Sequence, residues 1–410
     1  MSEIRIESFP AQEGDCFLVS IGKEKNKTHI LIDGGYSETY HDYLKARLEE
    51  LNKAGEYLSL VVVTHIDSDH IEGIIELLKE NKLAKSPQIV RIDEIWHNSY
   101  RHLNFEKKES ELNMDEKLIL TEMVNKGKLS RQDKKNNQHN QSKDISAKDG
   151  STLAGLIYKG KYNWNSSVNA LPIKCNTPDI ISLTPDIKVR ILSPSLESLN
   201  KLKKIWVKEL KKDKYDFKIT DDELFDDAYE FFLLDKDSYE DTEEDKGVSH
   251  KDQNLRLESF LKRKTKNDTS VANGSSISFI VEYKNKKLLF LADSHPQDIY
   301  KEVERLIKDC NYIPFFDFIK VSHHGSNRNT STELLTLIES PIYFFSTNGQ
   351  KHNHPHPETI ARIISRKGQK RCLMFNYPLE SELLFDEDLK KEYNFKVEFG
   401  NEETFKVIDL

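Results

Sequence analysis

The sequence predicts a layered α/β fold, and three of its segments carry this prediction. The first 35 residues alternate apolar and polar positions and end in a glycine pair, which is typical of short strands joined by turns. Residues 58–64 form a continuously apolar, β-branched run, the pattern of a strand buried on both faces. The last third alternates strand-like and helix-like segments. This order favours helices packed in layers on sheets.

The elements of the first third follow from local patterns. Apolar residues at helical spacing (Tyr43, Leu44, Leu48 and Leu51) predict a helix over His41–Ala54. In chain order we expect strands at 4–9, 16–19 and 29–32, this helix, a strand at 58–64, and a helix over Ile71–Leu83.

The middle third has weaker patterns. Residues 100–165 read as a polar, partly disordered insertion, with Asn125–Gly150 as its most polar run. Two strands are expected at 180–183 and 187–194, and residues 199–268 read as a charged helical insertion. Thirteen acidic and two basic residues lie between Asp221 and Lys246, which favours a solvated face; a metal-collecting or partner-docking role is the alternative. Because both polar stretches separate core-like segments, we expect a single domain over residues 1–410.

The last third predicts regular alternation of strands and helices. We expect strands at 276–283, 287–292, 317–322 and 342–346, and helices at 295–309, 331–338 and 357–366.

Composition excludes several classes of protein. There are 61 Lys and Arg against 69 Asp and Glu, a net charge of −8, so the chain does not coat nucleic acid by bulk charge, although a local basic groove stays open. The four cysteines are far apart in sequence, which argues against a thiolate zinc site and favours a reducing compartment. We find no signal peptide and no apolar run of about 18 residues, so we expect a cytoplasmic protein with no membrane contact.

The sharpest motif is Thr64-His-Ile-Asp-Ser-Asp-His70, which follows a buried strand and precedes a helix. Four possible ligands, His65, Asp67, Asp69 and His70, fall within six residues. Imidazole and carboxylate ligands suit zinc, manganese or iron. The alternative is a polar turn in which Asp69 caps the helix. Two histidines and two aspartates exceed what a cap requires.

Three further motifs end or follow apolar strands. Asp293 closes one such strand, and a helix cap is its alternative explanation. His323 and His324 end another and are followed by Gly-Ser, which fits a ligand beside a supporting neighbour. His352, His354 and His356 alternate in a proline-bounded loop, which is either functional or an exposed histidine tract.

Together these motifs resemble the metallo-β-lactamase fold superfamily, most closely the branch containing the hydrolase domain of the ComEC/Rec2 competence proteins and related choline-phosphate esterases. The matching segments are Glu13-Gly-Asp-Cys-Phe-Leu-Val, Ile30-Leu-Ile-Asp-Gly-Gly, His65–His70, Asp293, His323-His324-Gly-Ser, and Asn348 to Pro355. The resemblance implies a four-layer αββα sandwich and a dinuclear site holding two divalent ions, zinc or manganese. Asn273 lies near the place where most members have a metal-binding histidine.

The resemblance also implies roles for individual residues. One metal would be held by His65, Asp67 and Asp293, and the other by Asp69, His70, Asp293 and one of His323 and His324, more readily His324. Without the usual histidine the first site would be weak. Asp69 would orient a metal-activated hydroxide, and His354 or His356 would assist the leaving group. Substrate contacts are expected from Asn273, Ser326, Asn327 and Arg328, and Lys320 and Lys351 add positive charge.

These residues lead to three hypotheses of function. The first is a metal-dependent phosphodiesterase, a nuclease cleaving DNA or RNA. The second is a hydrolase of a small phosphodiester or ester. The third is a non-catalytic scaffold or defence-system component that acts through protein partners docked on the insertions.

Overall fold

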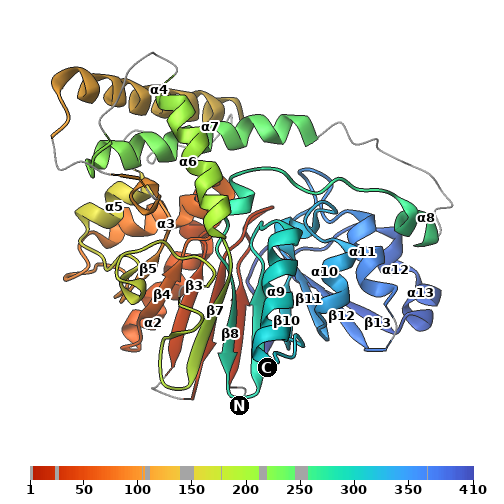
Figure 1. Ribbon diagram of the computed structural model, residues 1–410. Helices are drawn as coiled ribbons and strands as arrows, with labels where there is room; N and C mark the ends of the chain where they lie inside the picture. Colours follow the sequence, from red (N-terminus) through yellow and green to blue (C-terminus); the bar gives the residue numbers. More distant parts are fainter. Residues whose placement is uncertain are drawn as a thin grey trace.

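Two β-sheets packed face to face form the centre of the molecule. The computed structural model describes residues 3–23, 27–103, 105–106, 111–138, 152–176, 178–211, 219–244, 257–366 and 368–410. Helices cover the outer faces of both sheets, so the layers run helix, sheet, sheet, helix (Figure 1). The predicted four-layer α/β sandwich is confirmed.

The first sheet has six strands in the order β14-β1-β2-β3-β4-β5. The first three strands of the chain pair antiparallel, and β3, β4 and β5 are parallel. The last strand of the chain, β14, pairs with the first. The bounds are β1 Ile4–Ser8, β2 Phe17–Ile21, β3 Thr28–Ile32, β4 Leu58–Val62, β5 Ile95–Trp96 and β14 Lys406–Asp409.

The second sheet has eight strands in the order β13-β12-β11-β10-β9-β8-β7-β6. The strands from β9 to β13 are all parallel, and β6 to β9 pair antiparallel. The bounds are β6 Ile181–Ser182, β7 Ile187–Ser193, β8 Ser278–Tyr283, β9 Lys286–Phe290, β10 Phe318–Lys320, β11 Ile342–Phe345, β12 Arg371–Phe375 and β13 Phe395–Phe399.

The apolar core between the sheets is rich in aromatic rings. Phe17 of the first sheet contacts Phe290 and Phe344 of the second edge-on, with ring centroids 5.9 and 5.5 Å apart. Edge-to-face pairs of this kind stabilise a core beyond the area that they bury. Two further cores lie under the helices on the outer faces. The sheets are therefore held in a fixed mutual position, and so are the loops at their ends.

The outer helices complete the layers. On the first sheet lie α1 Ser37–Thr39, a π-helical turn Tyr40–Leu44, α2 Lys45–Lys53 and α3 Ser68–Asn81; on the second lie α9 Pro296–Cys310, α10 Thr332–Leu337, α11 Pro357–Ile364, α12 Glu382–Phe385 and α13 Glu387–Glu392. Short 3-10 turns occupy Tyr100–His102, Ser166–Val168, Asn273–Ser275 and Ser322–Gly325.

Helices from the two predicted insertions pack on one another at one end of the sandwich (Figure 1). They are α4 Met114–Gln138, α5 Leu153–Lys159, α6 Leu196–Leu210 and α7 Glu223–Glu244. The last helix of the second insertion, α8 Leu257–Lys262, lies apart from these four, beside α11 (Figure 1). Gly127 of α4 lies against Phe231 of α7, so closely that a Cβ at Gly127 would come within 2.5 Å of the Phe231 Cβ. The predicted polar run Asn125–Gly150 thus begins inside a packed helix. Its residues 139–150 lie outside the described ranges.

The structure adds strands that local patterns did not predict. β5, β12, β13 and β14 are short or follow charged segments, and each gains its partners from chain far away in sequence. Arg371, at the start of β12, is fully buried. The local sequence Arg-Cys-Leu-Met-Phe does not predict a buried arginine. Among the described helices, none has the length and apolar character to cross a bilayer.

Candidate metal centre

The loop between β4 and α3 positions the first half of the site. β4 is buried and ends at Val62, so His65 lies at the carboxyl end of a rigid strand. Asp67 occupies the N-cap position of α3 without a side-chain capping bond, and Asp69 and His70 fall in the first turn. The alternative explanation, in which Asp69 caps the helix, does not match this geometry.

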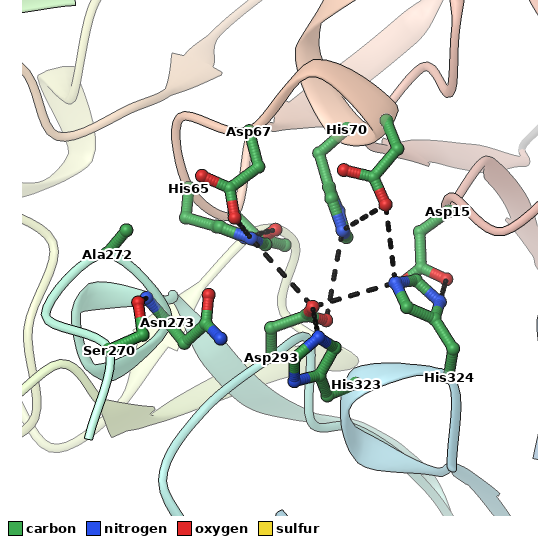
Figure 2. A network of polar contacts seen from close by, with 12 residues as sticks. Asp15, His65, Asp67, His70, Ser270, Ala272, Asn273, Asp293, His323 and His324 are labelled. Carbon is green, nitrogen blue, oxygen red and sulfur yellow. Dashed lines mark hydrogen bonds and ion pairs between the residues drawn. The ribbon is translucent and has the colours of Figure 1, made fainter. Parts of the chain in front are cut away.

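The second half comes from the second sheet. Asp293 follows β9 and His323 follows β10, and these two strands are parallel neighbours whose carboxyl ends lie at one edge. His323 and His324 both have left-handed backbone angles, with φ of 45° and 52°. Non-glycine residues adopt this conformation at a cost, and such strain is common at functional sites. The two halves meet in Figure 2.

Asp293 is the centre of this arrangement. Its Oδ2 lies 3.6 Å from Nε2 of His323, 3.6 Å from Nε2 of His324 and 4.0 Å from Nε2 of His65. Its Oδ1 lies 3.8 Å from Nε2 of His70. Asp69 Oδ2 is 3.4 Å from His324 Nε2 and 3.6 Å from His70 Nε2. Dashed lines in Figure 2 show these contacts converging.

The other ring nitrogen of each of these histidines is held by a protein oxygen. Nδ1 lies 2.9–3.0 Å from its partner in all four; the pairs are His65 with Thr64 Oγ1, His70 with Asp33 Oδ2, His323 with Asn329 Oδ1, and His324 with the Ser346 carbonyl. Such partners fix the Nδ1–H tautomer and leave Nε2 able to accept. The Nε2 atoms of all four imidazoles therefore face the region around Asp293.

The buried atoms at the centre fit a divalent cation. Within the described ranges, Nε2 of His70 and His324 and Oδ1 of Asp293 are buried and have no hydrogen-bond partner, and Nε2 of His65 faces only the Asp67 carboxylate, at 2.9 Å. Buried polar atoms are usually satisfied, so such a group needs an explanation. Two donor sets share His70: His65, His70 and Asp293, and Asp69, His70 and His324. Nitrogen and oxygen donors of this kind suit zinc or manganese.

A third set of donors, Asp15, Asp33 and His70, is already satisfied by the protein. Asp33 accepts hydrogen bonds from the amide and hydroxyl of Thr64 and pairs with His70 Nδ1. Asp15 forms an ion pair with the buried Lys320, whose Nζ is also 3.9 Å from Asp293 Oδ1. Lys320 was expected to add local positive charge, and its ammonium lies inside the site beside these carboxylates. The residue is 1% exposed and neutralises the site from inside.

The loop that carries Asp15 approaches the metal motif closely. At Gly14 an added Cβ would lie 2.1 Å from the Asp69 carbonyl oxygen, so only glycine fits. The Asp15 amide donates to the same carbonyl. The close approach to Asp69 requires a glycine at position 14. The hydrogen bond from its neighbour adds Asp15 to the residues that border the site.

The charges of the site reinforce one another. Burial alone would raise the pKa of Asp293, but His323, His324, His70 and His65 surround it and hold that pKa well below its ordinary value. Burial and the neighbouring His70 lower the pKa of His65 to about 4. Burial would also lower the pKa of His70, but Asp69, Asp33 and Asp293 raise it well above its usual value. The carboxylates are thus ionised and ready to bind a cation.

Asp67 and His323 border the donor sets but belong to neither set in the described part of the chain. Asp67 Oδ2 is 2.9 Å from His65 Nε2. The side chain of His323 is 15% exposed, against 0% for His65 and His70 and 4% for His324. His323 is therefore the outermost of the four imidazoles. Its ligand role, like that of Asp67, stays a prediction.

The histidine loop also reaches the site. The His354 ring lies 5.2 Å from that of His323 and 4.8 Å from that of His356, between centroids. Burial and then the neighbouring His323 lower the pKa of His354 well below its usual value. His356 Nδ1 accepts from the Asn327 amide. His354 thus borders the metal centre, and His356 lies beside His354; the catalytic roles of both stay predictions.

The predicted substrate contacts fall into two places. Asn273 lies on one side of Asp293 and His324 on the other (Figure 2), and its amide donates to Asp268 at 2.8 Å. Ser326 is fully buried, and its hydroxyl accepts from the Arg328 amide. The Asn327 side chain faces Glu358 at 3.4 Å. Their substrate contacts stay predictions; in this structure they mainly shape the turn after His324.

Comparison with known proteins agrees with this geometry. Residues 11–115 match the family model of the Metallo-beta-lactamase superfamily. This part of the chain is similar to that superfamily. Its members are generally metal-dependent hydrolases, and the matched stretch contains the complete His65–His70 motif.

Other comparisons add little. No curated protein matches the chain. Among solved structures, a mutant of the CmlA beta-hydroxylase is 10% identical, with a TM-score of 0.36, and the match covers 99% of this chain and 54% of that one. The chain thus spans about half the length of that protein, and a likeness this weak carries no argument about function.

Proposed function

We propose that this chain is a metal-dependent phosphodiesterase of the competence-protein branch, with DNA or RNA as its substrate. One observation carries the proposal: imidazoles from two different sheets have Nδ1 fixed by protein oxygens and Nε2 directed at one buried carboxylate, Asp293. A purely structural cluster would satisfy these nitrogens with hydrogen bonds. A cation supplies the missing partner.

The donor sets suggest how two divalent ions would be held. His65, Asp67 and Asp293 would contribute to one site, and Asp69, His70, Asp293 and His324 to the other, because the single Nε2 lone pair of His70 can serve only one ion. When bound, such ions lower the pKa of a water molecule and neutralise charge on a phosphate. Asp67, Asp69 and Asp293 lie close together at the centre of the site, and this concentration of negative charge favours binding of divalent cations.

The chain's own residues would position the substrate. Burial alone would raise the pKa of Asp69, but His70 and His324 lower it below its ordinary value, so Asp69 stays ionised and can accept a hydrogen bond that orients an attacking water. His354 Nε2 is buried and has no partner among the described residues, so this neutral ring can contact a phosphate oxygen.

Residues at the rim offer positive charge for an anionic substrate. Lys351 is part-exposed, and its ammonium donates to the Tyr36 hydroxyl at 2.9 Å and pairs with Glu13. This contact joins the histidine loop to the loop that precedes the second strand. The net charge of −8 restricts attraction of a polyanion to such local positions. Docking of a protein partner on the insertions remains a separate proposal.

A cleavage assay tests the function. Single- and double-stranded DNA and RNA are incubated with the protein in Mn²⁺ or Zn²⁺, beside Asp69→Ala and the exposed control Asp309→Ala. We expect cleavage by wild type and the control, and loss of at least about 100-fold in Asp69→Ala. Hydrolysis of a chromogenic phosphodiester without cleavage of any polymer would replace the nuclease by a small-substrate hydrolase. If the protein is inactive on every substrate, the hypothesis that it is an enzyme is contradicted, and the hypothesis of a non-catalytic scaffold is favoured.

A further inference from the structure

The segment between α8 and β8 is fastened to the loop that follows the two histidines. Arg263 donates to Glu358 at the start of α11, at 2.8 Å. Arg362 of α11 donates to Thr265 Oγ1 at 2.6 Å and also to the carbonyls of Asn327 and Thr330, at 2.7 Å each. These bonds place the end of the charged insertion directly beside the residues 326–330.

Asp268 is the buried carboxylate of this segment. Its Oδ2 accepts from Asn273 Nδ2 and from Asn329 Nδ2, both at 2.8 Å, and its Oδ1 accepts from the Ser270 amide at 2.8 Å. Its own amide donates to the Arg328 carbonyl at 3.2 Å. Asp268 is 4% exposed, so these three donors replace the water that a carboxylate would otherwise bind.

These bonds decide how the Asn329 amide is oriented. Its nitrogen faces three acceptors, namely the Asp268 carboxylate and the carbonyls of Asp293 and Ser294, at 2.8, 3.1 and 3.3 Å. The amide oxygen must therefore point the other way, where it lies 3.0 Å from His323 Nδ1. An oxygen at that position accepts a hydrogen bond, so Nδ1 of His323 carries the proton.

The fixed tautomer matters because of where His323 lies. Its Nε2 is 3.6 Å from Asp293 Oδ2, yet the ring is the most exposed of the four and belongs to neither donor set in the described part of the chain. Its backbone is left-handed, so the conformation persists only because surrounding contacts impose it. A neighbour that fixes the ring from behind is part of that restraint.

We propose that Asp268 is a positioning residue that acts through Asn329 to hold His323 in the Nδ1–H tautomer, with Nε2 directed at the Asp293 carboxylate. The role at the substrate rests on the proposed function; the effect on the tautomer does not. Asp268 lies at the end of the 199–268 insertion, so it also connects that insertion with the site.

The direct test is the tautomer of His323 in the metal-free protein. Long-range ¹⁵N–¹H spectra of ¹⁵N-histidine-labelled protein at about pH 8 distinguish the two tautomers, and His323→Gln assigns the signal. In wild type we expect the Nδ1–H form. In Asp268→Ala we expect an averaged signal or the Nε2–H form that free imidazole prefers. The Asp268→Asn variant keeps the side-chain volume but cannot accept all three hydrogen bonds. It replaces the alanine variant in this test if the alanine variant does not fold.

A matched control is Asp226→Asn, which removes a carboxylate of similar burial on α7 that pairs with Arg101 and not with His323. We expect this control to leave the His323 signal unchanged. If the Asp268 variants fold and keep the wild-type tautomer, or if Asp226→Asn alters it equally, the proposal is wrong.

Activity gives a second, separable readout. With a substrate that the wild type cleaves, Asp268→Asn should lower kcat about 10- to 100-fold with little change in KM or in Mn²⁺ affinity. If the Asp268 variants change the His323 tautomer but the wild-type protein cleaves no substrate, the positioning role of Asp268 is supported and the proposed function is contradicted. An unchanged tautomer in an enzyme that cleaves its substrate would support the proposed function and contradict the role of Asp268.

Discussion

At the scale of single residues, the site depends on the atoms behind the histidines as much as on the histidines themselves. Each Nδ1 has its own oxygen partner, and the strongest is Asp33, which is fully buried and also accepts two hydrogen bonds from Thr64. An acceptor of this kind orients a ligating ring and raises its basicity. Asp33 should therefore affect metal binding although its carboxylate is directed away from Asp293.

Asp33→Asn tests this directly. An amide in this position cannot accept from both Thr64 groups and from His70 at once, so the His70 ring loses its fixed tautomer. We expect Mn²⁺ affinity, measured by titration calorimetry, to fall about 10- to 100-fold. Asp317→Asn is the control, because Asp317 also accepts from a backbone amide and a side chain, those of Lys287 and Lys286. Equal affinities in the two variants would contradict the role of Asp33.

The residues that could be predicted are those whose neighbours lie close in sequence. His65, Asp69 and His70 were recognisable because a buried strand, a loop and a helix succeed one another within 25 residues. Asn329 and Asp268 could not be recognised in this way, because their roles depend on hydrogen bonds between residues up to 61 positions apart in the sequence. The sequence indicated that Lys320 adds positive charge, but not that its partner is Asp15 from the other sheet.

At the scale of elements, the packing of α4 against α7 shows how a polar segment becomes ordered. Local composition predicted a solvated excursion, since residues 125–138 contain few apolar side chains. The helix forms because the other face of α4 buries Leu120 and Val124. Gly127 then lets Phe231 come close, and a lone glycine in a helical segment gives no local sign of such a contact.

Gly127→Ala should destabilise the protein, against the intrinsic preference of helices for alanine. Alanine favours a helix by about 1 kcal/mol over glycine, but its methyl group would collide with Phe231, and overpacking costs about 1–3 kcal/mol. We expect a net loss of about 1–2 kcal/mol in urea unfolding. In a double-mutant cycle with Phe231→Ala the loss should largely disappear. A stabilised single variant would show that the two helices do not touch here.

At the scale of the whole molecule, the metal centre lies where the two sheets meet, so the site exists only when both halves are folded and docked. β14 pairs with β1, and the end of the chain thereby closes the first sheet. The layered class was predictable from alternating segments. The full count of strands was not, because the late strands are defined by partners rather than by their own sequence.

The second sheet also contains an ion pair on which its stability depends. Arg371, whose side chain is fully buried, makes two bonds to Glu339, at 2.6 and 3.1 Å. Burial alone would raise the pKa of Glu339, but its hydrogen bond to Arg371 and the charge of Arg366 lower it. A carboxyl with a lowered folded pKa stabilises the protein above its unfolded pKa of about 4.3, and this contribution is lost as the pH falls further.

Glu339→Gln should therefore cost about 3 kcal/mol at pH 7, because a buried guanidinium loses its counter-charge. The difference from wild type should shrink as the pH is lowered from about 5 to 3. Urea unfolding across this range measures both effects. Glu387→Gln, an exposed carboxylate paired with Lys390, should change stability by less than about 1 kcal/mol at any pH. A constant difference between Glu339→Gln and wild type would contradict the assigned pKa direction.

The central claim is that residues of two sheets form one divalent-metal site around Asp293. The most direct measurement is anomalous diffraction at the manganese edge from crystals of the protein grown with Mn²⁺. We predict anomalous density within bonding distance of Nε2 of His65, His70 and His324 and of the Asp293 carboxylate, and its loss in Asp293→Ala. Fully occupied manganese elsewhere, or none at Asp293 in a folded protein saturated with the ion, would contradict the account.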